Sequence, residues 1–233
     1  MLSPIRYILL ADWIAERRTN KYYIGKISLM VVINKPVVGT PALRVCQWIV
    51  KSNEQIPTVR LYVANPAKDF GRVYPTKEER IRHVLETPGE EERKYTVFTR
   101  DQFLSLESLP SIPEGVWVIS SRTTAGRHIP MMDLDAHTTG YDRDTINRII
   151  DQKCKGMTGY VLTTARGFHY YGGRLLNERE WHRFLASFGV LHYGATGRYI
   201  SYGLLYGETG LRLTSDKAKP GIPSLLRTIE KED

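Results

Sequence analysis

Apolar and polar residues alternate along the chain with two different periods, which predicts a mixture of strands and helices. A period of two residues indicates a strand, and apolar residues at every third or fourth position indicate a helix. In the first half, helices are predicted at 5–18, 40–55, 76–87 and 100–109, and strands at 26–33, 58–65 and 94–99. The proline- and glycine-containing stretch "PSIPEG" that follows is the best candidate for a boundary between two lobes.

The second half of the chain has a more regular order of elements. Strands are predicted at 115–120, 128–136, 159–165, 168–173 and 211–214, helices at 142–154 and 177–189, and an extended stretch before the last strand. From Ile129 onward this order resembles the split βαβ unit of ferredoxin-like and RRM-like folds. The predicted fold class is therefore α+β. An RRM-like unit over 111–233 packs against an N-terminal α/β lobe over 1–110, and together they form one compact two-lobed unit.

The strand "IPMMDLD" becomes polar only at Asp133 and Asp135. Because side chains alternate along a strand, both carboxylates are predicted on the face of Met131, with Met132 and Leu134 on the other. Two carboxylates that converge at a strand end form a hard, oxygen-rich site suited to Mg²⁺ or Mn²⁺, which normally also takes substrate phosphates as ligands. The alternative is a pair of surface aspartates, each bound to a nearby arginine.

A second motif, "TTARGFHYYGG", places Arg166 and Gly167 at a hairpin turn and His169 on the returning strand. In the predicted order of strands this hairpin can lie directly beside the Asp133 strand. There His169 would donate a hydrogen bond to a phosphate oxygen and Arg166 would hold another. Gly167 would let the backbone approach the ligand closely. The alternative for His169 is a purely structural histidine.

Composition and charge narrow the class of partner. The net charge is +8, with lysine and arginine spread along the chain, which favours polyanions and above all nucleic acid. No apolar run is long enough to span a membrane, and no signal-peptide pattern is present. The two cysteines, Cys46 and Cys154, show no metal-binding spacing, which excludes a cysteine-based metal site and suits the reducing cytoplasm.

Together, the two motifs resemble those of the archaeo-eukaryotic primase superfamily. "MMDLD" resembles the first motif through Asp133 and Asp135, and "ARGFH" resembles the second through His169. The resemblance covers roughly residues 116–216, and residues 1–110 match only loosely as the lobe behind the site. It implies a template-dependent nucleotidyltransferase, a DNA primase or primase-polymerase, which uses two divalent metal ions to add nucleotides to a 3′-hydroxyl.

The superfamily has a third motif, an apolar residue followed by an aspartate, for which two alignments stay open. One selects Asp216, although Ser215 precedes it; the other selects "GLRL" and puts Arg212 where an acid is expected. The resemblance implies that Mg²⁺ or Mn²⁺ is bound by the catalytic residues Asp133, Asp135 and Asp216. It also implies nucleotide binding by His169, Arg166, Gly167 and Lys217. The expected partners are a DNA template and primer, an NTP or dNTP, and a helicase or a larger replication or repair subunit.

Parts of the sequence also fit three other functions, to different extents. A catalytically degenerate primase-like protein would be a nucleic-acid-binding module or an accessory replication subunit. "DLDAHTTG" also resembles the DxD-then-Gly signature of Toprim domains, but these need a glutamate at an upstream strand end, and Glu114 precedes its strand. A haloacid-dehalogenase-type phosphatase would have threonine or valine at the position of His137.

Overall fold

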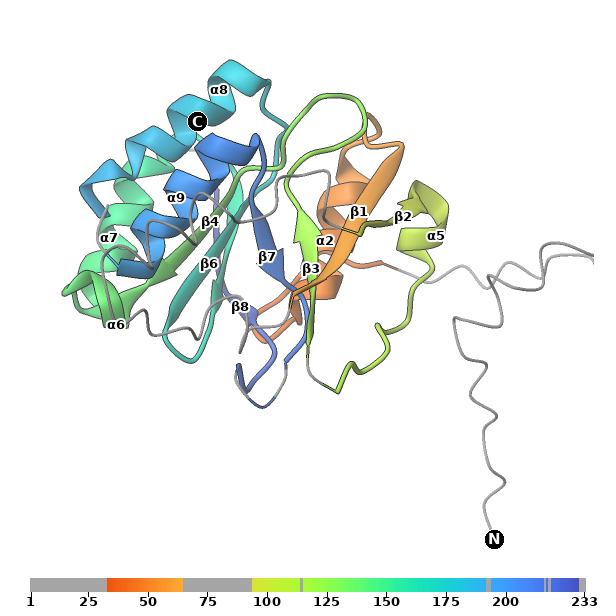
Figure 1. The fold of residues 1–233 in the computed structure, drawn as a ribbon, viewed down its shortest axis with the longest axis horizontal. Coiled ribbons are helices and arrows are strands. Elements are labelled where there is room, and N and C mark those ends of the chain that lie inside the picture. The colour runs from red at the N-terminus through yellow and green to blue at the C-terminus, as the bar shows by residue number, and fades with distance from the viewer. Residues whose placement is uncertain are drawn as a thin grey trace, which may run out of the picture. The chain divides into compact units, whose positions relative to one another are not determined.

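The computed structural model describes residues 33–64, 94–113, 115–191, 194–215, 217 and 219–230, which form two antiparallel sheets. The first sheet has the order β2-β1-β3-β7 and consists of β2 (Thr96–Thr99), β1 (Thr58–Ala64), β3 (Val116–Ser120) and β7 (Gly210–Arg212). The second has the order β4-β6-β5-β8 and consists of β4 (Met131–Asp135), β6 (Gly167–Gly172), β5 (Gly159–Thr163) and β8 (Ser224–Ile229). In Figure 1 the first sheet lies on the right. The predicted α+β class is confirmed.

Two helices, α2 (Ala42–Ser52) and α5 (Arg100–Leu104), accompany the first sheet, and a buried glutamine joins them. The Gln47 side chain is fully buried. Its Nε2 donates to the carbonyl oxygens of Phe103 and Leu106, both at 2.8 Å, and its Oε1 accepts from Arg44 at 2.8 Å. Because buried polar groups without partners are costly, Gln47 fixes α5 and the turn after it against α2.

We expect Gln47→Met to lower the free energy of unfolding by about 2–3 kcal/mol. Methionine has a similar size, but it removes the Nε2 donor from the carbonyls of Phe103 and Leu106 and the Oε1 acceptor from Arg44. The Leu106 carbonyl keeps its bond from Arg44 and the Phe103 carbonyl keeps that from the Leu106 amide, so the loss is that of the buried amide's own bonds. Urea unfolding measures the loss, and Gln152→Met, at an exposed position on α7 (Arg143–Lys153), is the matched control. A loss no larger than that of the control would show that water replaces the amide.

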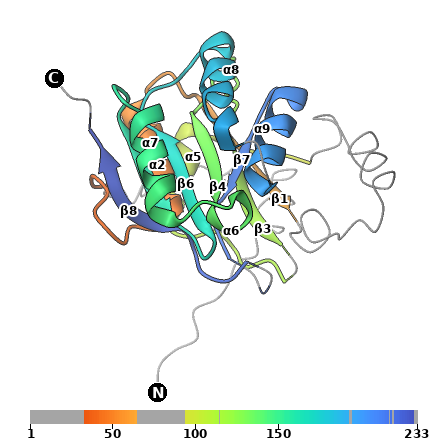
Figure 2. The same cartoon turned by 90° about the vertical axis from the view of Figure 1, so that its left-hand side faces the viewer.

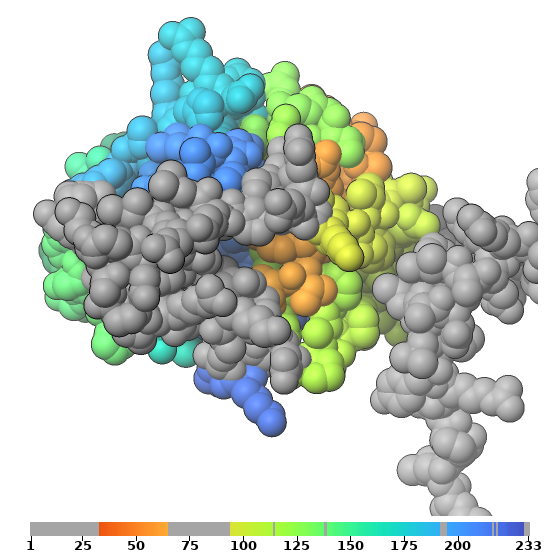
Figure 3. All heavy atoms as spheres, in the orientation of Figure 1, coloured from red at the N-terminus to blue at the C-terminus, as the bar shows by residue number. Residues whose placement is uncertain are grey.

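The second sheet contains a split βαβ unit, because the chain runs from β4 through α7 to β5, and β6 lies between the two strands. One face of this sheet packs against α7 and α8 (Glu178–Ser187), and Figure 2 shows α7 lying across β6. Both helices begin at a side-chain cap: Asp142 accepts from the backbone of Thr145, and Asn177 forms a capping box with Glu180. In Figure 3, α8 projects at the top of the surface.

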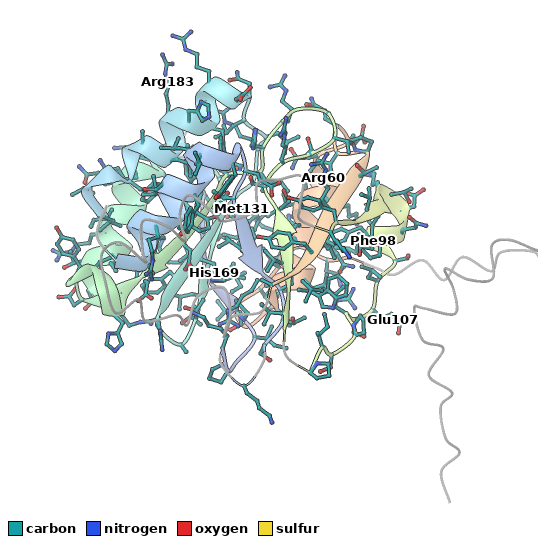
Figure 4. The ribbon with its side chains drawn as sticks, viewed as in Figure 1. Arg60, Phe98, Glu107, Met131, His169 and Arg183 are labelled. Atoms are coloured by element: carbon teal, nitrogen blue, oxygen red, sulfur yellow. The ribbon has the colours of Figure 1, made fainter. Side chains whose placement is uncertain are left out.

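The two faces of β4 enter two different cores, as the alternation predicts. Met132 and Leu134 pack with α7 and α8, whereas Met131 packs in the core that the second sheet shares with α2 and the first sheet. Figure 4 shows Met131 and His169 on neighbouring strands between the helices and the first sheet. The face of Asp133 is therefore the face that is directed toward the first sheet.

Most predicted elements within the described residues are confirmed, with shifted ends, but one prediction is wrong. The stretch predicted as extended is the helix α9 (Gly194–Tyr206), next to the short elements η3 (Gly189–Leu191) and α6 (Ala136–Thr139). Interior glycines disfavour a helix by about 1 kcal/mol each, so the sequence signal is weak. Packing overrides it: a Cβ on Gly203 would lie 2.5 Å from Thr209 and 2.9 Å from Leu185.

Strand β8 was not predicted, and it extends the second sheet beyond β5. In a ferredoxin-like order the last strand would flank β4; β7 lies beside β4 but pairs with β3. The RRM-like arrangement therefore stays a prediction, as does the division at residue 110.

Residues 31–233 form one compact unit. The helices predicted at 5–18 and 76–87, and the strand at 26–33 up to residue 32, lie outside the described residues. Within the described part of the chain, no helix combines the length and apolar character needed to cross a membrane.

Candidate active site

The antiparallel pairing of β4 and β6 places Asp133 directly opposite His169, and Asp135 opposite Gly167. The prediction that the hairpin lies beside the Asp133 strand is thus confirmed. The Nε2 of His169 lies 3.7 Å from Oδ1 of Asp133, and their side chains are 5% and 40% exposed. This distance is too long for a hydrogen bond, so the imidazole and the carboxylate face each other without a direct hydrogen bond.

Burial and neighbouring charges set the protonation of this pair. Burial raises the pKa of Asp133 to about 6; the charge of Lys219 opposes this shift, that of Asp135 adds to it, and that of Arg212 opposes it. Burial also lowers the pKa of His169 well below its usual value, and the charges of Arg212 and Lys219 add to this effect. At neutral pH the site therefore holds an ionised Asp133 and an uncharged His169.

Asp135 is held more tightly than Asp133. Asp135 is only 7% exposed, and its Oδ1 accepts a hydrogen bond from the backbone amide of His137 at 2.9 Å. Its own backbone amide donates to Oγ1 of Thr196 on α9 at 3.0 Å. The end of β4 is thus fixed by α6 and α9, while the neighbouring Asp133 is the more open carboxylate.

The β5–β6 turn lies against the end of β4. The carbonyl of Arg166 accepts a hydrogen bond from the Ala136 amide at 3.0 Å, while the Arg166 side chain is exposed. A Cβ on Gly167 would lie 1.8 Å from the carbonyl oxygen of Leu134. The close approach at Gly167 is therefore one between two protein backbones. The predicted roles of Arg166 and Gly167 in nucleotide binding stay predictions.

Two cations from β7 and the following loop act on the pair. The charges of Arg212 and Lys219 both affect the pKa of Asp133 and of His169. Lys217, which the sequence favoured, is exposed. Asp216, the predicted third carboxylate, lies outside the described residues. The structure therefore brings Lys219, rather than Lys217, toward the two facing side chains.

A protein-family model described as "Archaeo-eukaryotic primase 1D-like" matches residues 99–223, more than half of the chain. The chain belongs to this primase-like family. The matched segment includes the strand of Asp133 and Asp135 and the hairpin of His169. The resemblance stated from these motifs is therefore confirmed. No curated protein and no solved structure matches the chain significantly.

The candidate metal-binding groups of this primase-like chain are the two carboxylates on β4. Within the described ranges, no group of three or more histidine, cysteine, aspartate or glutamate side chains is placed to hold a metal ion. The donors on β4 are the carboxylates of Asp133 and Asp135. Two carboxylates fit a hard divalent ion that takes its remaining ligands from water and substrate phosphates. The residues present therefore fit Mg²⁺ or Mn²⁺.

Sequence reasoning missed one residue near Asp133 and one that supports the hairpin from the opposite face of the sheet. Tyr199 on α9 is partly buried and packs against both cores; burial raises the pKa of its hydroxyl well above the usual value, and the charge of Asp133 adds to the shift. Arg143 on α7 lies 4.3 Å from the ring of Phe168 and donates to Oγ1 of Thr163 at 2.8 Å, which ties α7 to the hairpin. Had the stretch 194–206 been predicted as a helix, Tyr199 would have been expected on its buried side.

Proposed function

We propose that this chain is a template-dependent nucleotidyltransferase, a DNA primase or primase-polymerase, that adds nucleotides to a 3′-hydroxyl. The observation that carries the proposal is the direct pairing of Asp133 with His169, next to Asp135, in a member of a primase-like family. This arrangement combines carboxylates for a divalent ion with a neutral imidazole for a phosphate oxygen.

Asp133 and Asp135 would hold Mg²⁺ or Mn²⁺, with Asp216 as the proposed third ligand. Bound divalent ions would lower the pKa of the attacking hydroxyl and neutralise charge on the leaving pyrophosphate. His169 is uncharged, so it can donate one hydrogen bond to a triphosphate oxygen without needing a partner for a buried charge. Its Nδ1 is buried and has no hydrogen-bond partner within the described residues, which leaves the ring free to adopt the required tautomer.

The remaining work of the protein is positioning and charge neutralisation. Arg166 and Lys217 are proposed to contact the incoming nucleotide, and basic residues elsewhere are proposed to hold template phosphates. DNA binding should accordingly weaken as salt concentration rises. A DNA template and primer, an NTP or dNTP, and a helicase or a larger replication or repair subunit are the proposed partners, and cytoplasmic DNA is the proposed location.

Removal of the metal tests this proposal. The wild-type chain, incubated with primed or unprimed single-stranded DNA, nucleotides and Mn²⁺ or Mg²⁺, should synthesise product that is resolved on a denaturing gel. An excess of EDTA should reduce synthesis to background, at least about a hundredfold, because the carboxylates alone do not neutralise a triphosphate. Adding back excess metal should restore it. Synthesis that is unaffected by chelation would contradict the proposed mechanism.

A second candidate is a nucleic-acid-binding module without catalytic activity. It is favoured by the two cations, Arg212 and Lys219, that act on Asp133, and by the lack of a third ligand in the described part of the chain. Titration with nucleotides, with and without Mg²⁺, distinguishes the two candidates. Tight DNA binding without metal-dependent nucleotide binding would support the module.

A further inference from the structure

One side chain holds the loop that follows β7. Nη1 of Arg212 lies 3.1 Å from the carbonyl oxygen of Thr214, 3.5 Å from that of Lys219 and 2.7 Å from that of Gly221. These bonds join the start of the loop to its end through a single guanidinium. Nη1 carries two hydrogens, so the shorter contacts to Thr214 and Gly221 are its main hydrogen bonds, and the 3.5 Å contact to the Lys219 carbonyl is a weak one. Because the guanidinium is planar and rigid, these bonds hold together the two ends of the loop that carries Lys219.

The same loop carries a cation toward the candidate active site. Arg212 is the last residue of β7, which lies beside β4, the strand of Asp133. Lys219 is partly buried, whereas Lys217 is exposed. The charge of Lys219 acts on both Asp133 and His169. The bonds from Arg212 to the Thr214 and Gly221 carbonyls thus tie to β7 the loop that carries this cation.

A cation at this place has a clear chemical use. Two carboxylates repel an incoming triphosphate, and a fixed ammonium next to them provides a partner for phosphate oxygens. We propose that Arg212 is a positioning residue, which holds the loop after β7 so that Lys219 binds the phosphate groups of a nucleoside triphosphate. This inference rests on the proposed nucleotidyltransferase function. It assigns to Lys219 a phosphate contact in addition to those proposed above, and gives Arg212 no contact of its own with the ligand.

Equilibrium binding of a fluorescent nucleoside triphosphate in excess Mg²⁺ tests the inference. Lys219→Gln should raise Kd about tenfold or more, because a charge-assisted bond to phosphate is lost. Arg212→Gln should raise Kd to a similar extent. The double variant should have the same Kd as Lys219→Gln alone, because both substitutions remove the same contact between Lys219 and phosphate. Arg183→Gln is the matched control, because Arg183 is exposed on α8 and points away from His169 (Figure 4).

A second measurement separates positioning from a direct contact. In Arg212→Gln and in Arg212→Lys, which keeps the charge and is the milder change for folding, the amides of Thr214, Ser215, Lys219 and Gly221 should exchange hydrogen faster than in the wild type. Their Kd should rise together with this exchange. Lys219→Gln should leave the exchange unchanged, because its backbone carbonyl still accepts from Arg212.

Three other results would contradict the roles given to Arg212 and Lys219. Additive effects of the two glutamine variants would show that Arg212 contacts the ligand itself, which overturns its role as a positioning residue. An unchanged Kd in Arg212→Gln would also overturn that role, while nucleotide binding by the wild type stands. If the wild-type chain binds no triphosphate, the proposed function fails, and the role of Lys219 fails with it.

Discussion

Replacing Asp133 with asparagine is expected to lower nucleotide incorporation by roughly a hundred- to a thousandfold, the scale seen when one preorganised charge-stabilising group is removed. Asp133 is the more open of the two carboxylates on β4 and directly faces His169. Asparagine preserves its shape but removes the charge that would attract a divalent ion. Single-turnover primer extension in Mn²⁺ measures this effect apart from product release.

Stability measurements show whether the Asp133→Asn loss has a structural cause. Burial raises the pKa of Asp133 to about 6, so above this pH the folded chain holds an ionised group that it disfavours relative to the unfolded chain. The contribution of Asp133 to stability should therefore fall as pH rises from about 4 to about 6, by a small amount because its side chain is 40% exposed. Asp133→Asn should leave Tm unchanged or higher at neutral pH. Asp144→Asn, at an exposed position in the first turn of α7, should leave activity unchanged.

Asp135→Asn should cause an activity loss similar to that of Asp133→Asn. The remaining amide oxygen can still accept the hydrogen bond from the His137 backbone, so the end of β4 should keep its conformation. Full activity in both variants would show that these carboxylates do not bind a catalytic metal, and would remove the main support for a nucleotidyltransferase.

Local patterns in the sequence are sufficient to predict the arrangement around Asp133. Alternation in "IPMMDLD" places Met132 and Leu134 on one face because each face of β4 packs into its own core. The short hairpin that contains Gly167 fixes β6 beside β5, and the split βαβ order allows β6 to lie beside β4 on its other side, as the structure shows. Both features involve residues that lie within about forty positions of one another in the sequence. Over this distance the alternation of side chains and the length of the turn are sufficient to predict which strands pair.

The rest of the site depends on contacts that no local pattern encodes. Helix α9 contains glycines and lies in a stretch with a weak helical signal, and it forms because it packs against β4 and α8. Lys217 and Lys219 are equivalent in the sequence, but in the structure Lys217 is exposed, whereas the charge of the partly buried Lys219 acts on Asp133. Prediction from one sequence therefore finds the motif residues and misses the side chains that position them.

Gly167→Ala is expected to lower the free energy of unfolding by about 3 kcal/mol or more, and Tm by about 6–12 °C. The added Cβ would lie 1.8 Å from the carbonyl oxygen of Leu134 and 2.9 Å from the amide nitrogen of Ala136. Both neighbours are backbone atoms of a paired strand end, so neither can rotate away as a side chain would. The end of β4 would have to move, and Asp135 would move with it.

This variant also separates two roles for Gly167, because each predicts a different measurement. If the glycine serves close packing of β6 on β4, Gly167→Ala loses stability first, and thermal unfolding detects it without any ligand. If it serves close approach of a nucleotide, Tm stays near the wild-type value and only the nucleotide affinity falls. Gly189→Ala is the matched control, because a Cβ there meets nothing within 4 Å, so Tm should stay constant or rise slightly. The geometry at the Leu134 carbonyl favours the first outcome, in which the glycine of the histidine motif holds β4 and β6 in register.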